Sequence, residues 1–219
     1  MISGWDRGIQ RILLFCFETL YHQLAWGYDF VAAIVSAGMW KSWVRSALDD
    51  IPPGRILELG PGPGHLLSEL RKRGRRPIGL ELSPAMLSIA RRRLTIGGRP
   101  ANLVRGDANQ TPFASQYFDA VVATFPAGYI FKAEFQKELM RLLKPGGQFI
   151  LLTLAEITGR RVHHRAMAWF LRISGVIRAP GQAARQLVEL YNSAGFSTAL
   201  TIRELENSRS YILSGRKPK

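Results

Sequence analysis

The stretch "ILELGPGPGHL", residues 56–66, runs from an apolar segment through an acidic residue into a glycine-rich turn. Gly60, Gly62 and Gly64 permit positive φ angles, and the helical pattern that follows would offer unpaired backbone N–H groups to a ligand. This arrangement predicts a site for a nucleotide-like ligand at the end of a strand. The dinucleotide fingerprint needs its third glycine three positions after the second, where this chain has His65, so the spacing disfavours NAD.

The acid before the turn narrows the choice of ligand. Glu58 at the end of the strand would repel a pyrophosphate but attract an ammonium or sulfonium group, by about 1–4 kcal/mol over several Å. Glu81 ends the next apolar run, where a carboxylate can accept both hydroxyls of a ribose. An acid at that second position suits NAD equally well, so Glu81 alone leaves the ligand open.

Outward from the turn, short apolar runs alternate with helical patterns, which predicts βαβ units and a parallel sheet. Ser83 is a candidate N-cap, with Pro84 at the first helical position. The expected strands are 55–59, 77–82, 102–106, 118–124 and 148–153, and the expected helices 65–73, 83–94 and 133–143, with a turn at 144–147. Two further strand patterns, 197–205 and 208–216, are so close together that they must form an antiparallel hairpin.

The chain divides into a helical N-terminal cap, residues 1–50, and a main domain, residues 51–219, with a basic amphipathic helical insertion near 157–188. Glu18 and Asp29 interrupt the N-terminal apolar region, so no run reaches the roughly 18 residues that a spanning helix needs. The single cysteine, Cys16, excludes an internal disulfide framework. A cytoplasmic protein is therefore expected.

The net charge of +14 allows nucleic acid or an anionic lipid surface as a partner, although 23 of the 30 basic residues are arginines and a biased genome composition would give the same count. Residues 157–188 contain six arginines and no acid. Their apolar positions at helical spacing are Val162, Ala166, Trp169, Phe170, Ile173 and Ile177. This stripe could rest on an anionic membrane, cap an apolar substrate or simply pack on the sheet.

Five motifs in order, E-L-G-P-G-P-G, L-E-L-S-x-x-M-L, G-D-A, F-D-A-V-V and L-K-P-G-G, resemble the class I S-adenosylmethionine (SAM) dependent methyltransferases over residues 55–153. The resemblance implies an α/β fold, with a Rossmann-like seven-stranded, mostly parallel sheet, its last strand antiparallel, and helices on both faces. The segment "LAWGYDFV", residues 24–31, is also similar to small-molecule members such as the quinone-biosynthesis C-methyltransferases. SAM is the implied cofactor and S-adenosylhomocysteine the product.

The resemblance also implies which residues bind the cofactor. They are Glu58, Gly60, Gly62, Gly64, Glu81, Leu82, Asp107, Ala108, Thr124, Phe125 and Tyr28. Glu58 would face the amino group of the methionine part, beside the backbone of the glycine turn. Glu81 would take the ribose hydroxyls, Leu82 would pack on adenine, and Asp107 with the backbone of Ala108 would bind the amino edge of that base.

On the acceptor side, Thr124 and Phe125 would line the path from the sulfonium to the acceptor, and Tyr28 would close it from the cap. Methyl transfer is an in-line displacement, so alignment and exclusion of water matter most. A general base is needed only for a weakly acidic acceptor. His163, His164 and Tyr28 are the candidates, or else the histidines are surface residues; adjacent residues on a helix point about 100° apart, so at most one histidine could serve. No metal is expected.

The expected function is methyl transfer to a small, hydrophobic or lipid-like acceptor, with other classes left open. RNA as acceptor fits the charge, but the fourth strand ends in "ATFPAGY" instead of the D/N-P-P-aromatic arrangement of enzymes that methylate exocyclic base nitrogens. A non-catalytic SAM-binding protein would show the same cofactor motifs. A nicotinamide-dependent oxidoreductase is disfavoured by Glu58 and by the glycine spacing.

Overall fold

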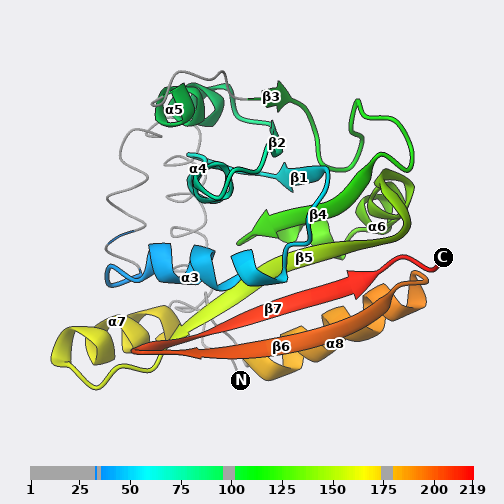
Figure 1. Ribbon diagram of the computed structural model, residues 1–219. Coiled ribbons are helices and arrows are strands. Elements are labelled where there is room, and N and C mark those ends of the chain that lie inside the picture. The colour runs from blue at the N-terminus through cyan, green and yellow to red at the C-terminus, as the bar shows by residue number, and fades with distance from the viewer. Residues whose placement is uncertain (1–32, 34–35, 96–101, 174–179) are drawn as a thin grey trace, which may run out of the picture.

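The computed structural model describes residues 33, 36–95, 102–173 and 180–219. Its strands are β1 (Ile56–Leu59), β2 (Ile78–Glu81), β3 (Asn102–Arg105), β4 (Phe118–Thr124), β5 (Leu143–Ile157), β6 (Ser197–Leu205) and β7 (Ser208–Arg216). They form one seven-stranded sheet in the order β3-β2-β1-β4-β5-β7-β6 (Figure 1). The carboxyl ends of β1, β2 and β4 therefore meet at one edge of this sheet, where open α/β sheets bind ligands.

Strand pairing confirms the expected fold class. β1 pairs in parallel with β2 and β4, β2 pairs in parallel with β3, and β4 pairs in parallel with β5. β7 runs antiparallel to both of its neighbours, β5 and β6. Only two residues separate β6 from β7, which is too short a link for a parallel crossover.

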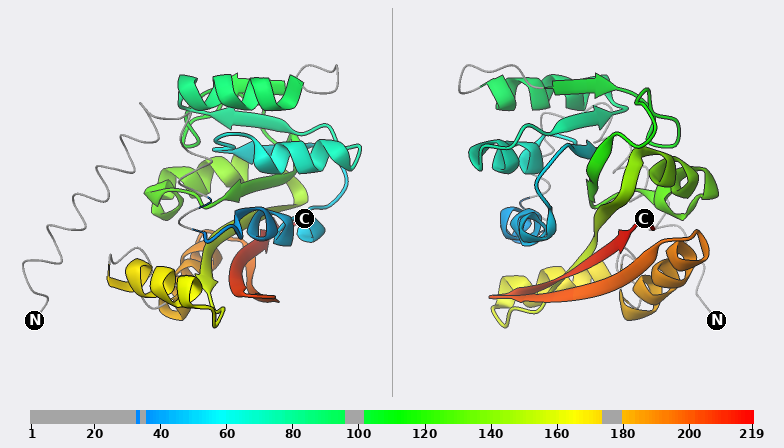
Figure 2. Two further views of the ribbon diagram at one scale, coloured as in Figure 1. Left: turned by 90° about the vertical axis from the view of Figure 1, so that its left-hand side faces the viewer. Right: turned by 45° about the vertical axis from the view of Figure 1, so that its right-hand side comes forward.

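Helices cover both faces of the sheet (Figure 2). They are α3 (Trp40–Ser46), α4 (His65–Lys72), α5 (Pro84–Thr95), α6 (Ala133–Leu142), α7 (Val162–Ile173) and α8 (Pro180–Ser193), with short 3₁₀ turns η2 (Leu48–Asp50) and η3 (Gly128–Phe131). α6 and α8 pack on the face that carries Leu57 and Leu59. α3, α4 and α7 pack on the opposite face, beside Ile56. Glu58 belongs to this second face, because side chains alternate along a strand.

Two of the expected helix boundaries have a clear local cause. α5 begins at Pro84, and the Ser83 hydroxyl accepts a hydrogen bond from the backbone N–H of Met86 at 3.4 Å, as an N-cap residue does. α4 ends shortly before Gly74, whose φ of +76° suits glycine. Both helices thus start or stop where the sequence predicts.

The expected turn at residues 144–147 has a different form in the structure. β5 begins directly after α6, and its pairing with β4 jumps from Leu143 opposite Phe118 to Gln148 opposite Ala120. The four intervening residues bulge out of the ladder, with Gly146 at a φ of +76°. The motif K-P-G-G therefore bends a long strand instead of preceding one.

The described part of the N-terminal region, chiefly α3 and η2, packs onto the sheet beside α4. The indole N–H of Trp43 donates to the Ser208 hydroxyl at 2.8 Å, and Ser46 shares a 2.9 Å hydrogen bond with Ser210. Arg203 on β6 pairs with Asp50 at 2.6 Å. The rest of the expected cap, including Tyr28, lies outside the described residues. No helix within the described ranges is long and apolar enough to cross a bilayer.

Candidate functional site

The glycine turn after β1 has the geometry that its sequence predicts. Gly60, Gly62 and Gly64 have φ angles of +64°, +52° and +81°. Hydrogen bonds join the turn to β2 and α5. The backbone N–H of Gly60 donates to the Leu80 carbonyl at 2.9 Å, and Arg93 donates to the Pro63 carbonyl at 2.7 Å. Apart from its two chain neighbours, no described residue has an atom within 4 Å of the position that a Cβ on Gly62 would take, so this side of the turn is open in the described part of the chain.

Glu81, at the end of β2, reaches across to the turn. Its Oε2 accepts the backbone N–H of Gly62 at 3.0 Å and its Oε1 accepts that of Ser83 at 2.9 Å, although the residue is only 1% exposed. A carboxylate has about four lone-pair sites, so these two bonds leave acceptor capacity on both oxygens. Glu81 can therefore hold the turn and still accept hydrogen bonds from a ligand.

Glu58 is completely buried, and neither of its carboxylate oxygens has a hydrogen-bond partner among the described residues. Burial raises the pKa of Glu58 from 4.5 to about 8, and the nearby Glu81 carboxylate adds to the rise. The backbone N–H of Leu67 and the Thr124 hydroxyl favour the charged form without reaching hydrogen-bond geometry. The sequence predicted a charged acid here; with a pKa of about 8, Glu58 favours the protonated form at pH 7.

Tyr129, on η3, is a site residue that the sequence analysis missed. Its hydroxyl is buried without a hydrogen-bond partner and lies 3.6 Å from the position that a Cβ on Gly60 would take. Burial, Glu81 and Glu58 together raise its pKa above the ordinary tyrosine value. In the sequence, only its place shortly after the end of β4 could have marked this tyrosine as a site residue.

Thr124 and Phe125 lie at the end of β4, beside Glu58. Phe125 adopts a φ of +49°, which is unusual for a bulky residue, and its N–H donates to the Leu152 carbonyl at 2.7 Å. Its ring packs on Trp40, with centroids 4.6 Å apart, and on Trp43 at 5.8 Å. Trp40 and Trp43 thus pack against the residue that directly follows β4.

The three residues expected around adenine lie after β2 and β3. Leu82 is 57% exposed although it is apolar, which leaves its side chain available for packing. Asp107 is exposed, and its Oδ1 accepts hydrogen bonds from the backbone N–H and the side-chain amide of Asn109, both at 2.8 Å. Ala108 packs partly buried against the core.

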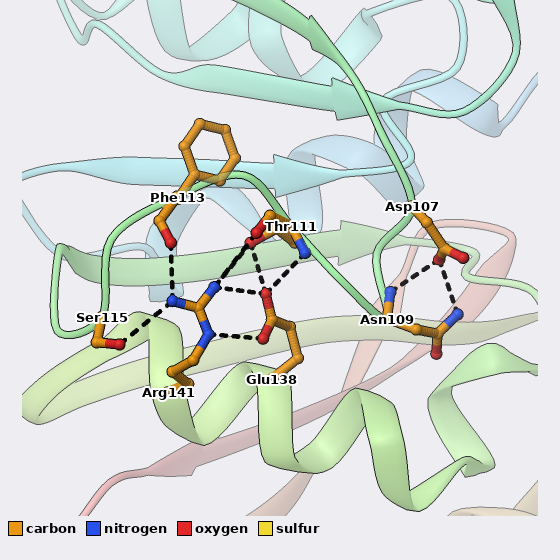
Figure 3. A network of polar contacts seen from close by, with 7 residues as sticks. All are labelled: Asp107, Asn109, Thr111, Phe113, Ser115, Glu138 and Arg141. Atoms are coloured by element: carbon orange, nitrogen blue, oxygen red, sulfur yellow. Dashed lines mark hydrogen bonds and ion pairs between the residues drawn. The ribbon is translucent and has the colours of Figure 1, made fainter.

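A polar network pins the loop that carries Asp107 to α6 (Figure 3). Arg141 donates to both oxygens of Glu138 at 2.7 Å, and to the Phe113 carbonyl at 2.7 Å. Glu138 also accepts the backbone N–H and hydroxyl of Thr111, at 2.8 and 2.7 Å. Although burial opposes it, these hydrogen bonds hold the pKa of Glu138 below its usual value. The network thus ties Thr111, four residues after Asp107, to α6.

The two histidines of α7 have different surroundings. His163 is exposed, whereas His164 is buried against Gly159 with Nδ1 unpartnered. Burial, His163 and Arg161 lower the pKa of His164. Within the described residues, no hydrogen bond or ring contact joins either histidine to Glu58, Glu81 or Tyr129. Of the candidate bases, the two histidines thus have no such contact with these acids or with Tyr129, and Tyr28 lies outside the described residues.

Comparisons with known proteins agree with this geometry. Residues 57–151, from β1 into β5, match a family model described as a methyltransferase domain. Over this stretch the chain is similar to a methyltransferase domain. The match covers the glycine turn, Glu81 and the end of β4, and it confirms the resemblance to SAM-dependent methyltransferases.

Curated relatives of this stretch include methyltransferases of quinone biosynthesis. The chain is 35% identical over 141 residues to a demethylmenaquinone methyltransferase of Thermus thermophilus, covering 61% of this chain and 63% of that protein. It is 32% identical over 146 residues to a ubiquinone/menaquinone biosynthesis C-methyltransferase of Bordetella avium, covering 63% and 57%. The chain therefore spans less than two thirds of the length of these relatives.

Solved structures support the fold. A putative SAM-dependent methyltransferase of Methanococcus maripaludis superposes with a TM-score of 0.61 at 18% identity, covering 91% of this chain and 94% of that one. Phosphoethanolamine N-methyltransferase 2 of Haemonchus contortus, in complex with SAM, also gives 0.61, at 16% identity, over 83% and 53%. At these identities the likeness concerns the fold alone.

The residues present fit SAM. Glu58 offers an acidic side chain, buried and unpartnered, to a cationic amino-acid end, and Glu81 has spare acceptor capacity for ribose hydroxyls. The open side of Gly62 leaves room for a ligand against the backbone. A buried acid without a partner needs an explanation, and a cationic ligand supplies one.

Proposed function

We propose that this chain is a methyltransferase that transfers the methyl group of SAM to a small, lipid-like acceptor. The observation that carries the proposal is Glu58, a fully buried acid with no hydrogen-bond partner among the described residues, beside a glycine turn whose Gly62 no described residue covers on one side. SAM, when bound, supplies a methyl group activated on a sulfonium. The protein's part is to hold the donor, orient the acceptor and exclude water.

The cofactor roles proposed for the residues follow their positions. Glu58 faces the ammonium of the methionine part, and the backbone from Gly60 to Gly64 encloses that part. Glu81 accepts the ribose hydroxyls, Leu82 packs on adenine, and Asp107 with the Ala108 backbone meets the amino edge of the base. Support comes from the exposure of Leu82 and from the network that fixes the Asp107 loop.

On the acceptor side, we propose Thr124 and Phe125 as the wall nearest the reacting methyl group, with Tyr28 closing the site. The aromatic contacts of Phe125 with Trp40 and Trp43 favour an apolar acceptor. The names of the relatives, demethylmenaquinone and ubiquinone/menaquinone methyltransferases, favour a lipid-like molecule of that general kind. His163 or His164 would act as a base only if the acceptor needs to lose a proton.

Calorimetric titration tests the cofactor, and labelled methyl transfer tests the acceptor. The protein should bind SAM and S-adenosylhomocysteine but not NADH. Incubation with labelled SAM and a whole-cell lipid and metabolite extract should place label in the lipid fraction. Binding without any transfer would indicate a non-catalytic SAM-binding protein, label in RNA would overturn the lipid-like acceptor, and tight NADH binding would overturn the cofactor.

We also propose peripheral contact with an anionic membrane surface, at the inner face of the cytoplasmic membrane. Met167, Ala168 and the buried Leu171 of α7 pack on the core. The stripe singled out in the sequence faces away from it, because Val162 is 84% and Trp169 64% exposed. Val162 and Trp169 therefore do not pack on the sheet, which was one of the alternatives for the stripe. The side chains of Phe170 and Ile173, and Ile177 altogether, lie outside the described part.

The positive charge beside this stripe favours an anionic lipid surface over an uncharged apolar partner. Arg161 and Arg165 are exposed beside it, and α7 contains no acid. An amphipathic helix with basic and apolar faces binds the interface of anionic bilayers. Because α7 follows the carboxyl end of β5, it would bring the substrate edge of the sheet toward the lipid.

Vesicle co-sedimentation tests this contact. The chain should bind vesicles that contain anionic lipid, and Trp169→Ala should weaken binding about tenfold, since a buried indole is lost. Ile202→Ala, on β6 and also exposed, is the matched control and should bind as the unaltered chain does. Equal binding of both variants, or RNA retention that survives high salt, would contradict the proposal.

A further inference from the structure

Tyr129 has a buried hydroxyl that no described residue engages in a hydrogen bond. Its Oη has no hydrogen-bond partner among the described residues. Tyr191, which is also buried, shows the usual pattern, because its hydroxyl donates to the Ile130 carbonyl at 3.0 Å. Buried phenol groups in folded proteins normally find a partner, so an unpaired one points to a missing ligand.

The hydroxyl is aimed at the glycine turn. It lies 3.6 Å from the position of a Cβ on Gly60, and the ring rests edge-on against Phe135 with centroids 5.0 Å apart. Tyr129 packs with the core on the α6 and α8 face, whereas Glu58 comes from the opposite face of the sheet. The two unpaired polar side chains thus approach the turn from opposite sides.

The chemistry of the two groups is complementary. Glu58 can receive a cation, but its charge would repel a carboxylate. Burial is the main cause that holds the pKa of Tyr129 above its ordinary value, and the charges of Glu81 and Glu58 add to it. The phenol therefore stays a neutral hydrogen-bond donor near pH 7. A ligand that presents an ammonium and a carboxylate side by side, as an amino acid does, would satisfy both groups.

We propose that Tyr129 is a cofactor-positioning residue whose hydroxyl donates a hydrogen bond to the carboxylate of the amino-acid end of SAM, while Glu58 receives the ammonium. This inference rests on the proposed function. It adds a recognition element from η3, outside the glycine turn, and it explains why the Tyr129 hydroxyl and the Glu58 carboxylate are buried without partners among the described residues.

Titration of Tyr129→Phe with three ligands tests the assignment. SAM and S-adenosylhomocysteine both carry the carboxylate, and decarboxylated SAM keeps the ammonium but lacks it. The variant should lose about tenfold affinity for the first two, as expected for one hydrogen bond to a charged group, and bind decarboxylated SAM as the unaltered chain does. Tyr117→Phe, whose ring stacks under Arg55, is the matched control and should change none of the three affinities.

The melting temperature separates a binding role from a structural one. Because the hydroxyl has no partner among the residues that the structure describes, Tyr129→Phe should melt at the same temperature or higher without ligand. A lower melting temperature, an equal loss for all three ligands, or no loss for any of them would overturn the proposal. Failure of the unaltered chain to bind SAM or S-adenosylhomocysteine would instead overturn the proposed function.

Discussion

The backbone N–H of Gly62 donates to Oε2 of Glu81 at 3.0 Å, so the acid that ends β2 holds the glycine turn that follows β1. Two segments 19 residues apart are thereby joined at the edge of the sheet where the ligand is proposed to bind. The carboxylate that fixes the shape of the turn is thus the one proposed to recognise the ligand.

Glu81→Ala should therefore lose both functions. The N–H groups of Gly62 and Ser83 would be left buried and unpaired, which should lower the free energy of unfolding by about 2–4 kcal/mol. Affinity for S-adenosylhomocysteine should fall by about a hundredfold. Urea denaturation and calorimetric titration measure the two effects; affinity retained in the variant would contradict the ribose assignment.

Glu81→Gln offers a graded comparison. The amide keeps one acceptor oxygen, so one of the two backbone hydrogen bonds survives. Stability and affinity should both fall between those of the unaltered chain and Glu81→Ala. If Glu81→Gln regained stability but bound S-adenosylhomocysteine as weakly as Glu81→Ala, the ligand would need the negative charge itself.

Glu58 should make stability decrease with pH. Its pKa is about 8 in the folded protein and 4.5 when exposed, so the folded state binds more protons between these values and loses its advantage as pH rises from 4.5 to 8. Glu58→Gln removes this titration. The stability of the variant relative to the unaltered chain should rise by about 2–3 kcal/mol between pH 6 and pH 9.

Urea denaturation at both pH values, without ligand, measures this difference, and comparing the two chains cancels the other titrating groups. The same variant should bind SAM more weakly, because the amide cannot carry the charge that receives an ammonium. A parallel pH dependence of the two chains would mean that Glu58 ionises normally in the folded protein.

Gly62→Ala tests whether the open side of the turn is where the ligand lies. Gly62 and Gly74 have φ angles of +52° and +76°, and neither would place a Cβ within 4 Å of another atom. Both alanine variants should lose about 1 kcal/mol of stability from backbone strain. Only Gly62→Ala should also weaken S-adenosylhomocysteine binding in titration; equal affinities would place the ligand elsewhere.

Arg141→Ala should loosen the loop that carries Asp107. Removing the guanidinium breaks its hydrogen bonds to Glu138 and to the Phe113 carbonyl, which should cost about 1–3 kcal/mol of stability. Affinity for S-adenosylhomocysteine should fall several-fold, whereas adenosine-free methionine analogues should be unaffected. Arg209→Ala, in an exposed pair with Glu204, is the control and should change little. An unchanged nucleoside affinity would contradict the role given to Asp107.

Much of the fold could be predicted because its signals are local. The strand before Gly60, the N-cap at Ser83 and the short link between β6 and β7 each depend on neighbouring residues, and the structure has all three. The turn at residues 144–147 was wrong in form, because whether such residues end a strand or bulge within it depends on its partner, β4.

The site was harder to predict where it depends on distant contacts. The helical spacing in α7 fits two apolar faces, one through Val162 and Trp169 and one through Met167 and Leu171. Periodicity alone cannot tell which of the two faces packs on the sheet. Tyr129 reaches the turn only through the tertiary fold. Burial of Glu58, which decides its protonation, is likewise a property of the whole sheet and its helices.

The central claim is that Glu58 receives the cationic end of SAM, and proton release on binding tests it most directly. Glu58 is largely protonated at pH 7 in the free protein and should ionise beside an ammonium. Calorimetric titration of SAM at pH 7 in buffers of different ionisation enthalpy should show close to one proton released per cofactor, and Glu58→Gln should release none. Cofactor binding with no proton release, or the same release from the variant, would contradict the account.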